Sequence, residues 1–174
     1  MLKKIIKRVF QLLLVGFIVI QFFRPAKNKS DGITNTDIAK LYDVPADVQG
    51  ILKKSCYDCH SNNTVYPWYS YIQPVAWWLD SHIKSGKRAL NFSEFGTYSI
   101  RRQYKKLDET NQLVRKGVMP LNSYLWIHKN AILNNQQRQA IDNWVTATRE
   151  KIRTTYPPDS LVGKKDQPAS PPNK

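Results

Sequence analysis

Residues 56–60 read Cys-Tyr-Asp-Cys-His, the C-x-x-C-H spacing by which c-type haem is attached to a protein chain. At the end of a helix, Cys56 and Cys59 lie one turn apart and face the same side, so both thiols can join vinyl groups of one porphyrin. His60 shares that face and can place an imidazole nitrogen over the iron. The sequence therefore predicts one covalent haem c, with Cys56 and Cys59 as the thioether residues and His60 as the proximal iron ligand.

Two other uses of this motif compete with haem attachment. A redox-active C-x-x-C of the thioredoxin type needs a βαβ setting, and no such pattern surrounds residues 56–60. A zinc site would combine Cys56 and Cys59 with two of His60, His82 and His128. The full pentapeptide favours haem over both alternatives.

The iron has a second face, and Met119 is the leading candidate for its ligand. Apart from Met1 it is the only methionine, and it precedes Pro120 in the loop 117–121, Gly-Val-Met-Pro-Leu. A thioether ligand raises the reduction potential of haem iron, whereas the alternative for Met119 is ordinary core packing. His82 is the alternative distal ligand, and His128 is a weaker one.

Aromatic and basic residues follow the motif and can surround a haem. We expect a carbonyl within residues 61–74, with Pro67 as the candidate, to accept a hydrogen bond from the second nitrogen of His60. Core packing and a solvated surface are the simpler interpretations of the other residues. The candidates for a haem wall or for propionate contacts are Trp68, Tyr69, Tyr71, Trp77, Trp78, Lys84, Lys87 and Arg88.

Helical patterns dominate the rest of the chain, and no long alternating run indicates a sheet, so the expected class is all-α. Asp47 is the expected N-cap of the first helix, and Gly86 is expected to end the second. The third is expected to break near Asp108, and Asn134 or Asn135 caps the last. The predicted helices cover residues 45–55, 74–85, 98–116 and 135–153.

The N-terminal segment is apolar after a basic start, with residues 9–23 free of charge. Its end, Gln-Phe-Phe-Arg-Pro, lacks the small residues of a signal-peptide cleavage site, so residues 1–24 are predicted as an uncleaved transmembrane anchor. Positive charge before the span predicts a cytoplasmic N-terminus. The expected location is the bacterial inner membrane, single-pass, with the haem domain in the periplasm.

Composition predicts the domain boundaries, and the net charge indicates which classes of partner to expect. Residues 25–33 are predicted as a linker, 34–156 as the haem domain, and 157–174 as a disordered Pro-rich tail. The 174 residues carry a formal net charge of +14, half of it from the seven Lys and Arg within residues 1–29. Because no basic helix with interleaved aromatics occurs, nucleic acid is not an expected partner. The membrane and redox proteins, including acidic ones, are expected partners.

The chain resembles the bacterial haem-binding domain family of small, membrane-anchored c-type proteins. The stretches that carry the resemblance are CYDCHSNNTVYPWYSYIQPVAWW, HIKSGKRALNFSEF, GVMPLNSYLWIHKNAIL and the helix around 141–144. It implies covalent haem c held by Cys56, Cys59 and His60. A more distant similarity to mono-haem cytochrome c implies a cytochrome c-like domain whose first and last helices cross, with Gly50 and Trp144 expected at the crossing.

The expected function is single-electron transfer by one haem at the extracytoplasmic face of the membrane, as a carrier rather than an enzyme. Two alternatives stay open. A haem peroxidase would use His82 with Lys84 or Arg88 as distal base and cation. A haem-based sensor or interaction module would let a ligand displace Met119.

Overall fold

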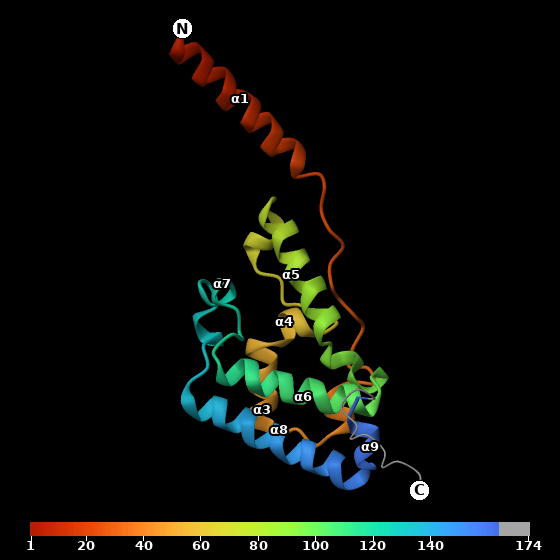
Figure 1. The fold of residues 1–174 in the computed structure, drawn as a ribbon. Helices are drawn as coiled ribbons and strands as arrows, with labels where there is room; N and C mark the ends of the chain where they lie inside the picture. The colour runs from red at the N-terminus through yellow and green to blue at the C-terminus, as the bar shows by residue number, and fades with distance from the viewer. Residues whose placement is uncertain (164–174) are drawn as a thin grey trace, which may run out of the picture.

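The fold is built from helices alone across residues 1–163, the part of the chain that the computed structural model describes (Figure 1). No strand occurs in this range. The predicted all-α class is therefore confirmed. Most of the predicted Pro-rich tail, residues 164–174, lies outside the described residues.

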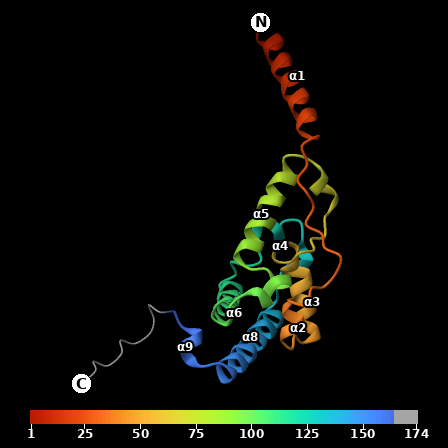
Figure 2. The same ribbon diagram turned by 90° about the vertical axis from the view of Figure 1, so that its right-hand side faces the viewer.

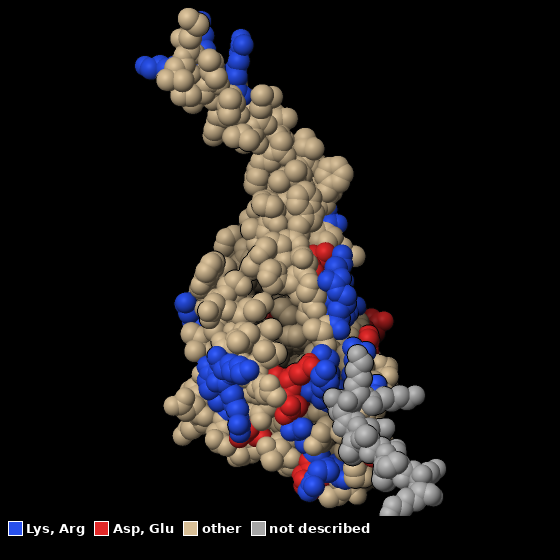
Figure 3. Space-filling view, in the orientation of Figure 1, with Lys and Arg blue, Asp and Glu red and all other residues tan. Residues whose placement is uncertain are grey.

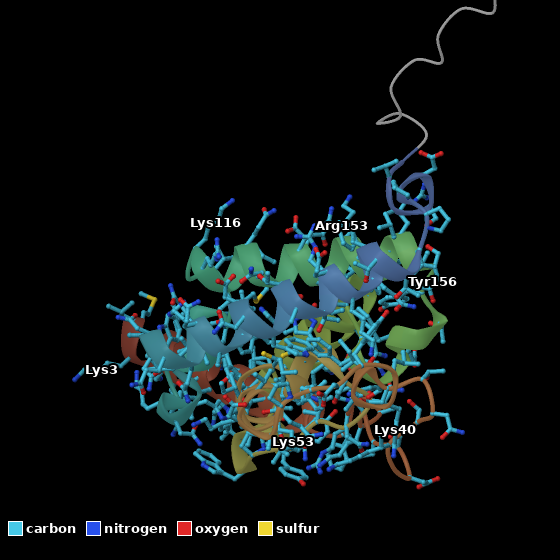
Figure 4. All side chains as sticks on the ribbon, turned by 90° about the horizontal axis from the view of Figure 1, so that it is seen from below. Lys3, Lys40, Lys53, Lys116, Arg153 and Tyr156 are labelled. Carbon is cyan, nitrogen blue, oxygen red and sulfur yellow. The ribbon has the colours of Figure 1, made fainter. Side chains whose placement is uncertain are left out.

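Three helices form the scaffold: α3 (Ala46–Ser55), α6 (Ile100–Arg115) and α8 (Asn135–Thr155). Helices α6 and α8 lie side by side, and α3 packs against α8 (Figures 1 and 4). Along α8 the buried side chains recur at helical spacing, which gives one apolar face toward the core. Those side chains are Ile141, Trp144, Val145, Thr148 and Ile152.

The long helices of the body lie where the sequence predicted them. One N-cap is as expected, whereas another N-cap and an expected break are not. Asn134 caps α8 in a capping box with Gln137, as expected. Helix α3 has Pro45 at its N-cap, so the assignment of Asp47 was wrong; Asp47 lies in the first turn. Helix α6 does not break near Asp108, whose carboxylate accepts a hydrogen bond from Arg149 of α8 at 2.7 Å.

Helix α5 (Val75–Ala89) runs through Gly86, so the prediction that this glycine ends the helix was wrong. Shorter helical segments lie between these elements and after α8. They are α2 (Ile38–Leu41), α4 (Tyr57–His60), η1 (Trp68–Tyr71), η2 (Phe92–Thr97), α7 (Asn122–Leu125), η3 (Lys129–Ala131) and α9 (Pro158–Leu161). Leu161 of α9 belongs to the core, so ordered structure continues beyond the predicted boundary at residue 156.

Helix α1 (Leu2–Ile20) projects away from the other helices and buries none of its residues (Figures 1 and 2). Among residues 1–163, no helix combines the length and the apolar character that crossing a membrane requires. The predicted single-pass anchor, and the inner-membrane location with a periplasmic domain that depended on it, are therefore wrong. The helix ends at Ile20, so its charge-free residues 9–20 rise only about 18 Å, against roughly 30 Å of hydrocarbon.

The predicted linker, residues 25–33, runs along the body of the protein (Figure 1). Its Asn28 is tied to the loop that follows α4. The backbone N–H of Thr64 donates to the Asn28 carbonyl at 3.1 Å, and Asn28 Nδ2 donates to the Ser61 carbonyl at 2.8 Å. This segment therefore lies against the residues that follow the C-x-x-C-H motif.

The expected Gly50–Trp144 crossing is only half right. Trp144 is buried and donates its indole N–H to the Asp43 carbonyl at 3.2 Å, and α3 does pack on α8. A Cβ at Gly50, however, would meet no atom within 4 Å. The close approach that needs a glycine occurs elsewhere, between α5 and α4.

Candidate functional site

The C-x-x-C-H motif forms its own single turn. Helix α3 ends at Ser55, and Cys56, with φ −129° and ψ −40°, separates it from α4. The Cys56 carbonyl then accepts hydrogen bonds from the N–H of Cys59 at 3.2 Å and of His60 at 3.0 Å. The two thiols and the imidazole are therefore held within one turn, as the spacing predicts.

Helix α5 presses directly against this turn. A Cβ built on Gly86 would lie 2.6 Å from the carbonyl oxygen of Cys59, closer than side chains come to backbone. Only glycine fits there, although glycine inside a helix costs about 1 kcal/mol relative to alanine. The close contact fixes the position of α4 on α5.

The ring of His60 is oriented by the end of α5. Its Nδ1 lies 2.9 Å from the carbonyl of Leu90, the C-cap residue of α5. Because a carbonyl only accepts, the proton must be on Nδ1, which leaves Nε2 as the nitrogen with a free lone pair. The expected partner within residues 61–74, with Pro67 as candidate, is therefore wrong.

Burial sets the protonation of the motif. It lowers the pKa of His60 below its ordinary value, against the opposite effect of the Leu90 carbonyl, so the imidazole is neutral, as a metal ligand must be. Burial also raises the pKa of Cys56 to about 12 and that of Cys59 to about 11. Both cysteines are free thiols.

Two cavities adjoin the motif, of about 210 and 110 Å³, and we call them together the motif cleft. Figure 3 shows the surface hollowed between α5 and α7, where the cleft lies. Both cavities are lined in common by the six residues Ser55, Cys56, His60, Ala89, Met119 and Pro120. The proximal candidate His60 and the distal candidate Met119 therefore both line each of the two cavities.

The end of α6 brings Met119 to the cleft. Gly117 takes a left-handed φ of 68°, and its N–H donates to the Val114 carbonyl at 3.1 Å. The N–H of Val118 donates to the Leu113 carbonyl at 3.0 Å, which completes a Schellman motif. The N–H of Met119 also bonds Leu113, at 3.2 Å. This tight reversal turns the chain from α6 toward His60.

The other two histidines are placed differently. His82 lines only one of the two cavities, and its Nδ1 lies 2.9 Å from the Trp78 carbonyl. His128 lines neither; its Nε2 lies 2.6 Å from the Tyr69 hydroxyl. Within residues 1–163 no group of three or more His, Cys, Asp or Glu side chains is arranged to hold a metal ion, so the zinc alternative has no ligand set there.

The basic residues that were candidates for contacts to the propionates lie outside the cleft. Lys84 pairs with Asp80 at 2.7 Å, Lys87 donates to Asn28 at 2.7 Å, and Arg88 donates to Ser85 at 3.1 Å. None of the three lysine and arginine side chains lines the motif cleft. A distal His82–Lys84 or His82–Arg88 pair is thus not formed in the cleft.

The aromatic residues after the motif do not form a wall of the cleft either. Trp68 is 76% exposed, and Trp77 and Trp78 are 41% and 47% exposed. None of the five expected aromatic side chains, Trp68, Tyr69, Tyr71, Trp77 and Trp78, lines either cavity. The simpler interpretation of these residues as core or surface side chains therefore fits the structure better than a haem wall.

Sequence reasoning missed Asp58, Lys106 and Tyr124. The Tyr124 hydroxyl of α7 donates to Asp58 Oδ2 at 2.7 Å, which joins the segment after Met119 to the motif. Lys106 of α6 lines the second cavity. Asp58 could have been selected from the sequence because it lies between the two cysteines of the motif. Nothing in the sequence distinguishes Lys106 from the other lysines.

The geometry fits haem: one cleft is lined by a neutral imidazole, two free thiols and a thioether. A family model described as "Haem-binding domain" matches residues 15–147. This chain belongs to that haem-binding domain family, as its resemblance suggested. No curated protein and no solved structure matches the chain.

Proposed function

We propose that this chain is a c-type haem protein that transfers single electrons. One haem would be joined to the thiols of Cys56 and Cys59, and His60 and Met119 would bind its iron. The observation that carries the proposal is that His60 and Met119 line the same two adjoining cavities, whereas His82 lines only one.

The cofactor would supply a one-electron ferric–ferrous couple, and the protein would supply two fixed ligands. The Leu90 carbonyl holds the Nδ1 proton of His60 and so presents Nε2. The Schellman turn at Gly117 holds the backbone of Met119 at the cleft, from where its thioether would serve as the second ligand. Ligands fixed by the backbone in this way need little movement when an electron arrives or leaves.

The second cavity of the cleft has a largely apolar lining. Leu90 and Phe92 are 8% and 2% exposed, and Val114 is 3% exposed, where they line the second cavity. Apolar surroundings disfavour the ferric charge, and a thioether ligand acts in the same direction, so both features favour a raised potential.

Redox proteins are the proposed partners. The chain carries 27 Lys and Arg against 13 Asp and Glu, so an acidic surface on a partner would be attracted to it. Lowering the ionic strength should then speed electron exchange with an acidic redox protein and slow it with a basic one.

The test compares Met119→Ala with His82→Ala, two truncations at the same cleft. We expect wild-type protein and His82→Ala to have six-coordinate low-spin spectra and to bind carbon monoxide weakly. Met119→Ala should become high-spin in the reduced form and bind carbon monoxide readily, because the sixth position opens. An unchanged spectrum in Met119→Ala, or loss of the low-spin spectrum in His82→Ala, would refute the ligand assignment. Peroxide turnover by the wild type would favour the peroxidase alternative instead.

A further inference from the structure

We propose that Lys106 of α6 binds the propionates of the haem, so that the propionate edge of the porphyrin faces α6. This inference rests on the proposed covalent haem. It assigns a role to a residue that sequence reasoning did not select, and it fixes which way round the cofactor lies in the cleft.

The two ends of the motif cleft differ in where the cysteines lie. Cys56 lines both cavities, whereas Cys59 lines only the cavity bordered by His82 and Tyr124. The attachment edge of a haem joined to both cysteines would therefore lie toward that cavity. In haem the two propionates project from the edge opposite the two vinyl groups, so they would point toward the other cavity, under α6.

The charges at the two ends favour the same orientation. Among residues 1–163, Lys106 is the one Lys or Arg that lines either cavity, and it belongs to the α6 end. The opposite end carries the carboxylate of Asp58. A propionate there would meet a like charge in partly desolvated surroundings, whereas near Lys106 it would meet an opposite one.

Glu109 competes with a propionate for the ammonium group of Lys106. It lines the same cavity, and its Oε2 lies 2.6 Å from Lys106 Nζ. An ammonium group has three N–H donors, so one bond to Glu109 leaves two for a propionate. Glu109 also lies 3.7 Å from Lys105, so it keeps a second cation when Lys106 turns toward the cofactor.

Lys105 provides a matched control. It neighbours Lys106 and pairs with the same Glu109, yet its side chain is 73% exposed, against 21% for Lys106, and it does not line the cleft. Lys106→Gln should shift the midpoint potential to more negative values, because an uncompensated propionate charge favours ferric iron. Lys105→Gln should leave the midpoint potential close to that of the wild type. Lys106→Arg keeps the positive charge, so its potential should also stay closer to the wild type than that of Lys106→Gln. Equal potentials for the two glutamine variants, or an equal shift in Lys106→Arg, would overturn the proposal.

A second measurement needs no variant. In the reduced wild-type protein, nuclear Overhauser contacts from the propionate methylene protons should reach side chains of α6 around Lys106 and Thr110. Contacts to Tyr124 and His82 instead would mean the reverse orientation and would overturn the proposal. Both experiments begin with a protein whose haem survives denaturation and extraction. Loss of haem at that step refutes the proposed function, whereas retained haem with the wrong contacts refutes only the role of Lys106.

Discussion

The His60 side of the motif cleft and the Met119 side are built from contacts of different range. His60 is held by Leu90, thirty residues further along the chain, and its turn is held by the close approach of Gly86 to Cys59. Met119 is placed by hydrogen bonds to Leu113 and by the left-handed Gly117, all within the same few residues. The first side therefore depends on the docking of α5, and the second follows from the way α6 ends.

Gly86→Ala disrupts the long-range contact between α5 and α4 and should have the largest effect on stability. The new methyl carbon would lie 2.6 Å from the Cys59 carbonyl, so α4 and α5 must separate. We expect the free energy of unfolding of the haem-loaded protein to fall by about 1–3 kcal/mol, the usual cost of overpacking. Chemical denaturation followed by circular dichroism measures it.

Gly50→Ala is the matched control for that variant. Gly50 also lies inside a helix, but its added Cβ would have open space. Removing a helical glycine there should stabilise the protein by about 0.5–1 kcal/mol. Two variants of equal stability would show that α5 does not approach the motif as closely as described.

Gly117→Ala disrupts the local turn at the end of α6 that positions Met119. An alanine at φ 68° carries a strain of about 1–2 kcal/mol, which relaxes if the turn opens and Met119 moves away. We therefore expect a stability loss of this size together with partial conversion of the low-spin spectrum to high-spin. Absorption spectra of the purified protein, and unfolding by denaturant, measure the two effects.

Asn134→Ala serves as the comparison. It removes the capping box of α8 and should cost about 1 kcal/mol, a loss of similar size, at a helix end that does not lead into Met119. The spectrum should stay as in the wild type. If Asn134→Ala changed the spectrum as much as Gly117→Ala, the local control of Met119 would be disproved.

Tyr124→Phe tests the hydrogen bond that joins the two sides and should have the smallest effect. It removes the hydroxyl that donates to Asp58 at 2.7 Å. The expected loss is about 1 kcal/mol, with faster carbon monoxide binding because α7 is less firmly tied to the motif. Carbon monoxide rebinding kinetics provide the measurement, and unchanged kinetics would mean that this bond does not restrain the distal side.

The same difference in range explains what could be read from the sequence. The single turn of Cys56, Cys59 and His60 follows from spacing, and the core helices follow from apolar periodicity and from the Asn134 cap. Met119 was predictable as a candidate since its loop is local and the chain offers one methionine besides Met1.

Several residues near the site that sequence reasoning placed wrongly depend on how α5 packs. Its axis passes close to Cys59, which requires glycine at 86 inside the helix rather than after it. That packing brings Leu90 to His60 and turns Lys84 and Arg88 toward another part of the surface. No local pattern reports the contact, because it joins segments about thirty residues apart.

The central claim is that the motif cleft holds a haem through two thioether bonds. The most direct test is the intact mass of the purified chain, produced together with the machinery for c-type haem attachment and measured after denaturation and acid-acetone extraction. We predict that the wild-type chain carries the added mass of one haem and keeps its colour, and that Cys56→Ala/Cys59→Ala loses both. A colourless wild-type chain at its bare polypeptide mass would contradict the account.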